Sequence, residues 1–223
     1  MNEQIFFSRI AARLGRPSPL QKTPVRAATE VGAPAFWREA QNEAGADSAD
    51  RFQEELESLG GEVKRVDSGT QLREALSSLL RELQPGCLGL WGEDFSARYG
   101  LREVLRPYDT VLWDTDGPAE FTRVHAVLTG CAYAVADSGT IVLMSDRRQG
   151  RSVALLPAVH LVIVHRSQIR LRLCDVLDEL SAHRDDLPSY VHFITGPSRS
   201  SDIENDQTVG IHGPAAVIAL LVP

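Results

Sequence analysis

The chain has 223 residues, 43% apolar and 24% charged, a balance typical of folded globular proteins rather than disordered segments. Its 23 Lys and Arg against 30 Asp and Glu give a formal net charge of −7, which disfavours general nucleic-acid binding, because that needs clustered cations. The longest apolar stretches are shorter than the roughly 20 residues of a membrane-spanning helix, and the amino terminus lacks a continuous apolar signal region, so we expect a cytoplasmic protein.

Residues 1 to 48 are predicted to form an amino-terminal arm. Ile5, Phe6, Ile10 and Leu14 follow a spacing close to that of a helix, and a Pro- and Gly-rich stretch without periodicity comes next. Two interpretations stay open: the arm covers a neighbouring subunit or a partner, or it is a helix and loop that pack on their own domain or stay mobile.

Residues 49 to 223 are predicted to form an α/β domain, and helices alternate with short strands in its first half. Leu56 and Leu59 line a helix that ends at a glycine pair, and Ser68 or Thr70 can cap the next helix. The predicted elements are a helix over 49–59, a strand over 62–66, a helix up to 83, a strand over 87–91, a helix over 96–105 and a strand over 110–113. Such alternation favours parallel pairing.

The second half of the domain adds a predicted hairpin, because only Asp137, Ser138 and Gly139 separate two strands. The predicted elements are a helix over 118–128, strands over 133–136, 140–144 and 159–164, a helix over 167–182, and strands over 191–194 and 215–222. The fold class is therefore α/β, with a mostly parallel central sheet flanked by helices and an added hairpin.

The polar segment over residues 195 to 204 is a candidate anion-binding site. It leaves a buried strand, turns at a Gly-Pro pair, and offers hydroxyls and Arg199 where a short helix could begin. Its polar side chains are Ser198, Arg199, Ser200, Ser201, Asp202 and Glu204. In the alternative interpretation a serine only caps the helix, and Arg199 pairs with Asp202 or Glu204.

His212 lies between glycines in the loop over residues 210 to 214 and could act as a proton donor, a proton acceptor or an anion contact. An ordinary loop histidine is the alternative. We expect this loop and the 195–204 segment to lie side by side at the carboxyl ends of their strands, where open α/β sheets bind ligands. A hydrolase triad of Ser198, His212 and Asp202 is a weaker alternative, because the turn lacks the second glycine of a nucleophile elbow.

Two further segments carry polar groups that fit either a site or ordinary structure. The turn from Asp137 through Ser138 and Gly139 to Thr140 holds a carboxylate and two hydroxyls at a strand end, or is a hairpin turn alone. The basic loop ending in Arg151 could receive an anionic ligand or a partner's acidic face, or be solvated. His160 and His165 flank a predicted strand at an odd separation, so they point to opposite faces and cannot jointly hold a metal, and we expect both to be structural.

The sequence predicts no cofactor bound by this chain alone. It contains no G-x-G-x-x-G, phosphate-loop, H-E-x-x-H or EF-hand motif. Its three cysteines, Cys87, Cys131 and Cys174, are dispersed and form no C-x-x-C, so we expect buried thiols in a reducing compartment and no metal site.

Taken in order, the motifs of the second half resemble the LUD-domain family, in particular its lactate utilisation C group. The match runs from about Thr129 to the carboxyl terminus, and its most specific parts are the patterns GPSR-x-x-DIE and G-x-HGP. The motifs are Thr129-Gly130, the 137–140 turn, Gly150-Arg151, residues 155–157 with His160, residues 193–204 and residues 210–214.

The resemblance implies a fold like that of the ribose-5-phosphate isomerase, glucosamine-6-phosphate deaminase and CoA-transferase superfamily. It also implies an accessory or substrate-binding subunit in a complex that oxidises L-lactate to pyruvate, with the iron–sulfur clusters in partner proteins. The alternative is a self-standing isomerase-like or acyl- or CoA-transferase-like enzyme acting on a small anionic metabolite. The oligomeric state stays open, a homo-oligomer included.

We take His212 and Asp137 as candidate catalytic residues. The candidate substrate-binding residues come from the turn, the basic loop and the two carboxyl-terminal loops. They are Ser138, Gly139, Thr140, Arg151, Ser198, Arg199, Ser200, Ser201, Asp202, Glu204 and Gly213.

Overall fold

The computed structural model describes residues 3–13, 15–16, 18, 47–146, 149–183, 186–200 and 208–223. The chain divides into two units, Met1–Gly45 and Ala46–Pro223. In the first unit the helix α1 spans Glu3–Arg13, which confirms the predicted amino-terminal helix. Most of the predicted arm that follows lies outside the described residues.

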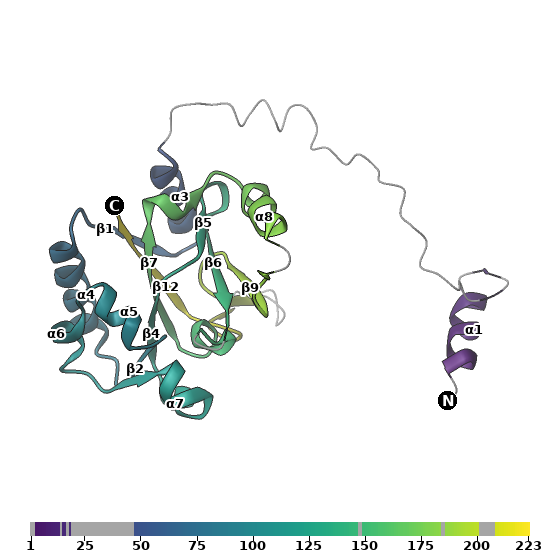
Figure 1. Cartoon of the computed structure of the whole chain (residues 1–223), viewed down its shortest axis with the longest axis horizontal. Helices are drawn as coiled ribbons and strands as arrows, with labels where there is room; N and C mark the ends of the chain where they lie inside the picture. Colours follow the sequence, from purple (N-terminus) through teal and green to yellow (C-terminus); the bar gives the residue numbers. More distant parts are fainter. Residues whose placement is uncertain are drawn as a thin grey trace. The chain divides into compact units, whose positions relative to one another are not determined.

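The second unit is built on a six-stranded sheet in which every pair of neighbours is parallel, as predicted (Figure 1). Its central strands are mostly apolar because both faces of the sheet are covered. In sheet order the strands are β1 (Glu62–Arg65), β12 (Ala216–Val222), β7 (Val159–His165), β4 (Ala126–Thr129), β2 (Leu88–Leu90) and β3 (Thr110–Leu112).

One face of this sheet is covered by helices. Ser68 caps α4 (Gly69–Leu83) by accepting a hydrogen bond from the Gln71 amide at 3.2 Å. The leucines of α4 pack with α5 (Glu93–Arg98) and α6 (Arg102–Leu105) against one set of strand side chains, which includes Leu161 and Ile163 of β7.

The opposite face is covered by α3 (Ser48–Ser58) and by a second, four-stranded sheet (Figure 1). The alternate residues Val162 and Val164 of β7 pack here with Phe52 and Leu56 of α3. The second sheet runs β8 (Ile169–Arg170), β5 (Tyr133–Val135), β6 (Thr140–Ser145) and β9 (Tyr190–Ile194), and the antiparallel β5 and β6 confirm the predicted hairpin.

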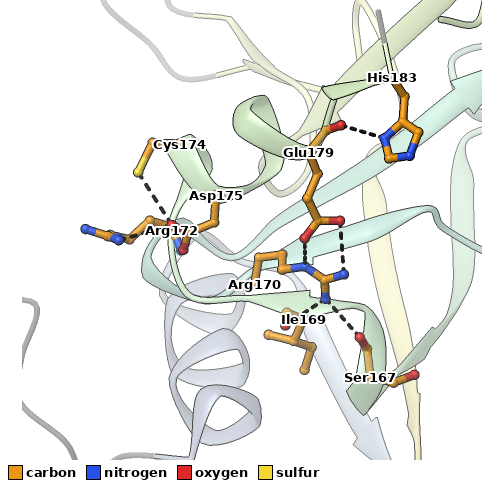
Figure 2. Close-up of polar contacts among 8 residues, drawn as sticks. All are labelled: Ser167, Ile169, Arg170, Arg172, Cys174, Asp175, Glu179 and His183. Atoms are coloured by element: carbon orange, nitrogen blue, oxygen red, sulfur yellow. Dashed lines mark hydrogen bonds and ion pairs between the residues drawn. The ribbon is translucent and has the colours of Figure 1, made fainter. Parts of the chain in front are cut away.

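The helix predicted over residues 167 to 182 is wrong in its first part. A 3-10 turn, η4 (Arg166–Gln168), and strand β8 come first, and α8 begins only at Leu173 (Leu173–Ala182). The Asp175 carboxylate accepts a hydrogen bond from the Arg172 amide at 2.9 Å, which fixes this start. Figure 2 shows Arg170 of β8 pointing at Glu179 of α8, a two-point ion pair that joins the two elements.

Two other predicted helices differ from the structure. The helix over 118–128 is wrong, because α7 (Trp113–Glu120) and η1 (Phe121–Arg123) end before β4, whose residues are buried between β2 and β7. The helix over 96–105 is broken into α5 and α6. Gly100 lies between them with a φ of +62°, outside the helical region.

The short elements complete the domain. The turn η2 (Ala136–Ser138) joins β5 to β6, and η3 (Arg151–Ala154) precedes β7. Strands β10 (Arg199–Ser200) and β11 (Thr208–Val209) pair with each other, so the chain at Arg199 is extended where a helix start was expected. Across the described ranges no helix is long and apolar enough to cross a membrane.

Candidate functional site

A cavity of about 620 Å³ opens at the carboxyl edge of the parallel sheet. Its lining includes residues that follow four strands: Trp91 after β2, Asp114 near the end of β3, Cys131 after β4, and His165 at the end of β7. Open α/β sheets bind ligands at this edge. The volume lies within the roughly 300 to 1,000 Å³ of sites for small molecules and cofactors.

One wall of the cavity is aromatic. Phe95 and Tyr99 are four residues apart on and just after α5, so they lie one above the other. Trp91 meets Phe95 edge-on at a centroid distance of 5.6 Å, and Phe95 meets Tyr99 in the same way at 5.3 Å. The His165 ring stacks on Tyr99 at 5.8 Å. The rings thus continue from β2 to the end of β7.

His165 and Tyr99 form a polar pair in this wall. The Tyr99 hydroxyl lies 2.9 Å from His165 Nε2, and His165 Nδ1 lies 3.1 Å from the backbone oxygen of Pro223. Burial raises the pKa of the Tyr99 phenol, and the neighbouring Arg98 guanidinium, which also lines the cavity, partly offsets the rise. A hydrogen-bonded hydroxyl and imidazole therefore lie beside a cation, in a lining that also holds the carboxylates of Asp94, Asp114, Asp146 and Asp186.

Gln168 lines the cavity and links His165 to Cys131. Its amide nitrogen donates to the Cys131 carbonyl at 2.5 Å, and its oxygen accepts from the His165 backbone amide at 2.8 Å. Burial raises the pKa of the Cys131 thiol to about 12, so this sulfur stays protonated near neutral pH. Cys131 is therefore a buried, protonated thiol in the cavity wall.

The predicted loops at residues 195–204 and 210–214 do lie side by side in their described part. The Ser198 amide donates to the Pro214 carbonyl at 2.8 Å, and the Gly210 amide donates to the Ser198 carbonyl at 2.9 Å. Their expected position is wrong for the second loop, because Gly210 and Pro214 precede β12 and so lie at the amino edge of the central sheet. His212 is exposed there.

Arg199 makes a contact that its sequence motif does not predict. Its guanidinium donates to the carbonyl of Leu59, at the carboxyl end of α3. Ser201, Asp202 and Glu204 lie outside the described residues, as does the side chain of Ser200. Gly213 packs against Ser198, since a Cβ at Gly213 would lie 3.3 Å from the Ser198 Cβ.

The Asp137 turn joins the same neighbourhood through a chain of hydroxyls. Thr140 Oγ1 lies 2.8 Å from the Ser138 hydroxyl and 2.8 Å from the Thr195 hydroxyl. Burial raises the pKa of the Asp137 carboxyl, and the Arg51 guanidinium of α3 partly offsets the rise. The turn and the 195 segment therefore lie next to each other, as a shared site would need.

Arg151 is not brought to this neighbourhood. Its guanidinium lies 4.7 Å from the centre of the Tyr190 ring, at the start of β9, whereas Thr195 follows the other end of that strand. The predicted site residues therefore occupy two ends of the second sheet. Within the part of the chain that the structure describes, no group of three or more His, Cys, Asp or Glu side chains could hold a metal ion.

None of the site residues predicted from the sequence lines the cavity, whose lining comes from α5 and from segments that follow different strands. His165 was expected to be structural, but it lines the cavity. His160 is buried, and its Nε2 lies 2.8 Å from the Thr129 hydroxyl, which agrees with a structural role. The available signal was position, because Trp91, Cys131 and His165 follow or end apolar strands at the edge where ligands bind.

Comparison with known proteins gives consistent matches. Residues 49–222 match the family described as the LUD domain. A protein named Lactate utilization protein C from Bacillus subtilis is 30% identical over 234 residues, which cover 99% of this chain and 96% of that protein. One of the same name from Halalkalibacterium halodurans is 33% identical over 159 residues, covering 68% and 69%.

A solved structure has the same fold. The crystal structure of a DUF162 family protein from Deinococcus radiodurans superposes with a TM-score of 0.60 at 22% identity, covering 79% of this chain and 96% of that one. At this identity the likeness shows the fold alone.

Proposed function

The chain belongs to the LUD domain family, and on that premise we propose that it is an accessory or substrate-binding subunit of a complex that oxidises L-lactate to pyruvate. In this proposal, iron–sulfur partner proteins carry the electrons. The relatives named Lactate utilization protein C support a role in lactate utilisation. The cavity at the carboxyl edge of the sheet is the observation that favours substrate binding by this chain.

Reconstitution with iron–sulfur partners tests this proposal. We expect the tagged full-length chain to retain the partner proteins, and L-lactate to bleach the absorbance of their clusters only when the chain is present. A partner complex that oxidises lactate equally fast without this chain would contradict the proposal.

We propose that this chain binds no cluster, zinc or flavin when purified alone. The three cysteines support this, because Cys87 lies before β2, Cys131 after β4, and Cys174 is exposed on α8. The described residues also bring together no metal-binding set. Metal analysis and an absorption spectrum of the pure chain test the proposal, and a stoichiometric cluster would refute it.

A self-standing enzyme for a small anionic metabolite is the second candidate function. The pairing of Tyr99 with His165 beside Arg98 favours it, because such a pair can accept a proton next to a bound anion. Turnover by the pure chain, without partners or added cofactor, would support this candidate. In this second proposal the domain resembles the ribose-5-phosphate isomerase and CoA-transferase superfamily in fold, and it would act on a small anionic metabolite as an enzyme of that kind.

The neighbourhood of Ser198, Arg199 and His212 stays our sequence-derived proposal for a site that binds a small anion. Its support is the direct contact between the two loops and the adjacent hydroxyls of Thr195 and Thr140. This site lies at the opposite edge of the central sheet from the cavity. Substitutions at Arg199 and at Arg98 therefore separate the two locations.

A further inference from the structure

We propose that Arg98, Tyr99 and His165 form a subsite for a 2-hydroxycarboxylate in the cavity. In this subsite the Arg98 guanidinium binds the carboxylate, and the Tyr99 oxygen accepts a hydrogen bond from the substrate hydroxyl. The choice of L-lactate as the ligand to test rests on the proposed function. The assignment of groups rests on the geometry of the cavity.

The hydrogen bonds of His165 determine what Tyr99 offers to a ligand. The backbone oxygen of Pro223 can only accept, so the Nδ1 atom 3.1 Å away carries the proton of the neutral imidazole. Nε2 is then an acceptor, and the Tyr99 hydroxyl 2.9 Å away donates to it. The Tyr99 oxygen is left with lone pairs, which accept a hydrogen bond from a ligand.

The surroundings hold this pair in one orientation. The His165 ring stacks on Tyr99, and its backbone amide donates to the Gln168 side chain. Tyr99 is packed edge-on against Phe95, which is buried. An acceptor whose direction is fixed by its neighbours discriminates a ligand that donates from one that does not.

Arg98 supplies the matching charge. It is exposed, lines the same cavity, and acts electrostatically on the Tyr99 phenol. A guanidinium binds carboxylates through two parallel hydrogen bonds. A ligand with a carboxylate beside a hydroxyl therefore satisfies Arg98 and Tyr99 together, whereas a ligand without the hydroxyl satisfies Arg98 alone.

Ligand titrations followed by NMR test the subsite on the purified full-length chain. The probes are L-lactate, propionate, which lacks the hydroxyl, and pyruvate, whose ketone oxygen cannot donate. The variants are Tyr99→Phe, which keeps the ring, and Arg98→Met, which keeps much of the side-chain length. Tyr108→Phe and Arg102→Met are matched controls outside the cavity lining.

We expect wild-type protein to bind L-lactate about fivefold to tenfold more tightly than propionate or pyruvate, the usual effect of one hydrogen bond. Tyr99→Phe should bring this ratio close to one. Arg98→Met should weaken all three ligands by about tenfold to a hundredfold and leave the ratio between them unchanged. The control variants should behave as wild type.

Three results would overturn the subsite. The first two are a lactate preference that persists in Tyr99→Phe, and wild-type protein that shows no such preference. The third is a loss of affinity in Arg199→Ala while Arg98→Met binds as tightly as wild type. Lactate-driven reduction of the iron–sulfur partners is measured separately. If that reduction persists while the binding ratios fail, the subsite is refuted and the proposed function stands. If wild-type protein shows the binding ratios without any such reduction, the subsite is supported and the proposed function fails.

Discussion

His160 and His165 show how position along one strand sets the chemistry of a side chain. Both belong to β7, but His160 is fully buried, and His165 ends the strand at the cavity. Their odd separation predicts opposite faces and says nothing about burial. Burial depends on the neighbouring strands β4 and β12, which come from distant parts of the sequence.

The buried imidazole of His160 should make stability depend on pH. Burial lowers its pKa from 6.5 to about 4, so the unfolded chain binds a proton more readily than the folded one between these values. The contribution is fully present above pH 6.5 and is lost as the pH falls to 4, up to about 3 kcal/mol.

Urea unfolding of wild type and His160→Gln at several pH values measures this contribution. We expect the unfolding free energy of the variant to fall less steeply between pH 7 and 4. His125→Gln, which changes an exposed imidazole, is the control. Parallel pH profiles for wild type and His160→Gln would show that His160 is not the responsible group.

Arg199→Ala separates the two roles of Arg199. If Arg199 is the anion contact, it contributes about 1.5 to 3 kcal/mol to binding, so Arg199→Ala should weaken carboxylate affinity about tenfold to a hundredfold, and the Arg98 subsite would then be wrong. Its contact with the Leu59 carbonyl is exposed, and we expect losing that contact to lower stability by about 1 kcal/mol. Calorimetry and urea melts on the same variant measure both quantities. Unchanged carboxylate affinity with a large loss of unfolding free energy would show that Arg199 is a structural residue that holds its strand against the end of α3.

At the scale of elements, amphipathic and punctuated segments were predictable, and so were the central strands β2, β7 and β12, but β4 was not. The stripe of α4 and the hairpin of β5 and β6 follow local spacing, so they were found. Strand β4 is buried on both sides and shows no alternation, and it was mistaken for part of a helix. The carboxyl-edge cavity was missed for a related reason, because only the order of the strands brings its residues together.

The packing of the hairpin turn on α3 predicts that replacing Gly139 by a larger residue destabilises the domain. Gly139 has a φ of +57°, and an added Cβ would lie 2.6 Å from the Leu56 Cα, in the backbone of α3. We expect Gly139→Ala to lose about 3 kcal/mol of unfolding free energy, about 1 to 2 from the left-handed conformation and the rest from overlap.

Gly100→Ala is the matched control for this prediction. Gly100 has a similar φ of +62°, but its Cβ would meet only the Arg73 side chain, at 3.7 Å. The control should therefore lose only the conformational contribution of about 1 to 2 kcal/mol. Equal losses in the two variants, measured by urea unfolding, would show that the contact with α3 adds nothing.

At the scale of the whole molecule, the four hydrophobic clusters found among the described residues all belong to the second unit. Its four clusters are drawn from residues between Ala49 and Val222. The described helix of the first unit, α1, instead exposes Ile5, Phe6 and Phe7. Each of these clusters is therefore formed by residues of the α/β domain itself.

Removal of residues 1 to 45 should accordingly leave the stability of the α/β domain almost unchanged. We expect a change in unfolding free energy within about 0.5 kcal/mol, the size seen for surface changes away from a core. Urea melts of the full chain and the truncated chain measure it, and a full-length Phe6→Asp, Phe7→Asp variant tests the apolar face of α1 without shortening the chain. A loss well above 1 kcal/mol in both variants would show that the arm packs on its own domain. Unchanged stability, combined with weaker retention of the iron–sulfur partners, would instead assign the exposed face of α1 to those partners.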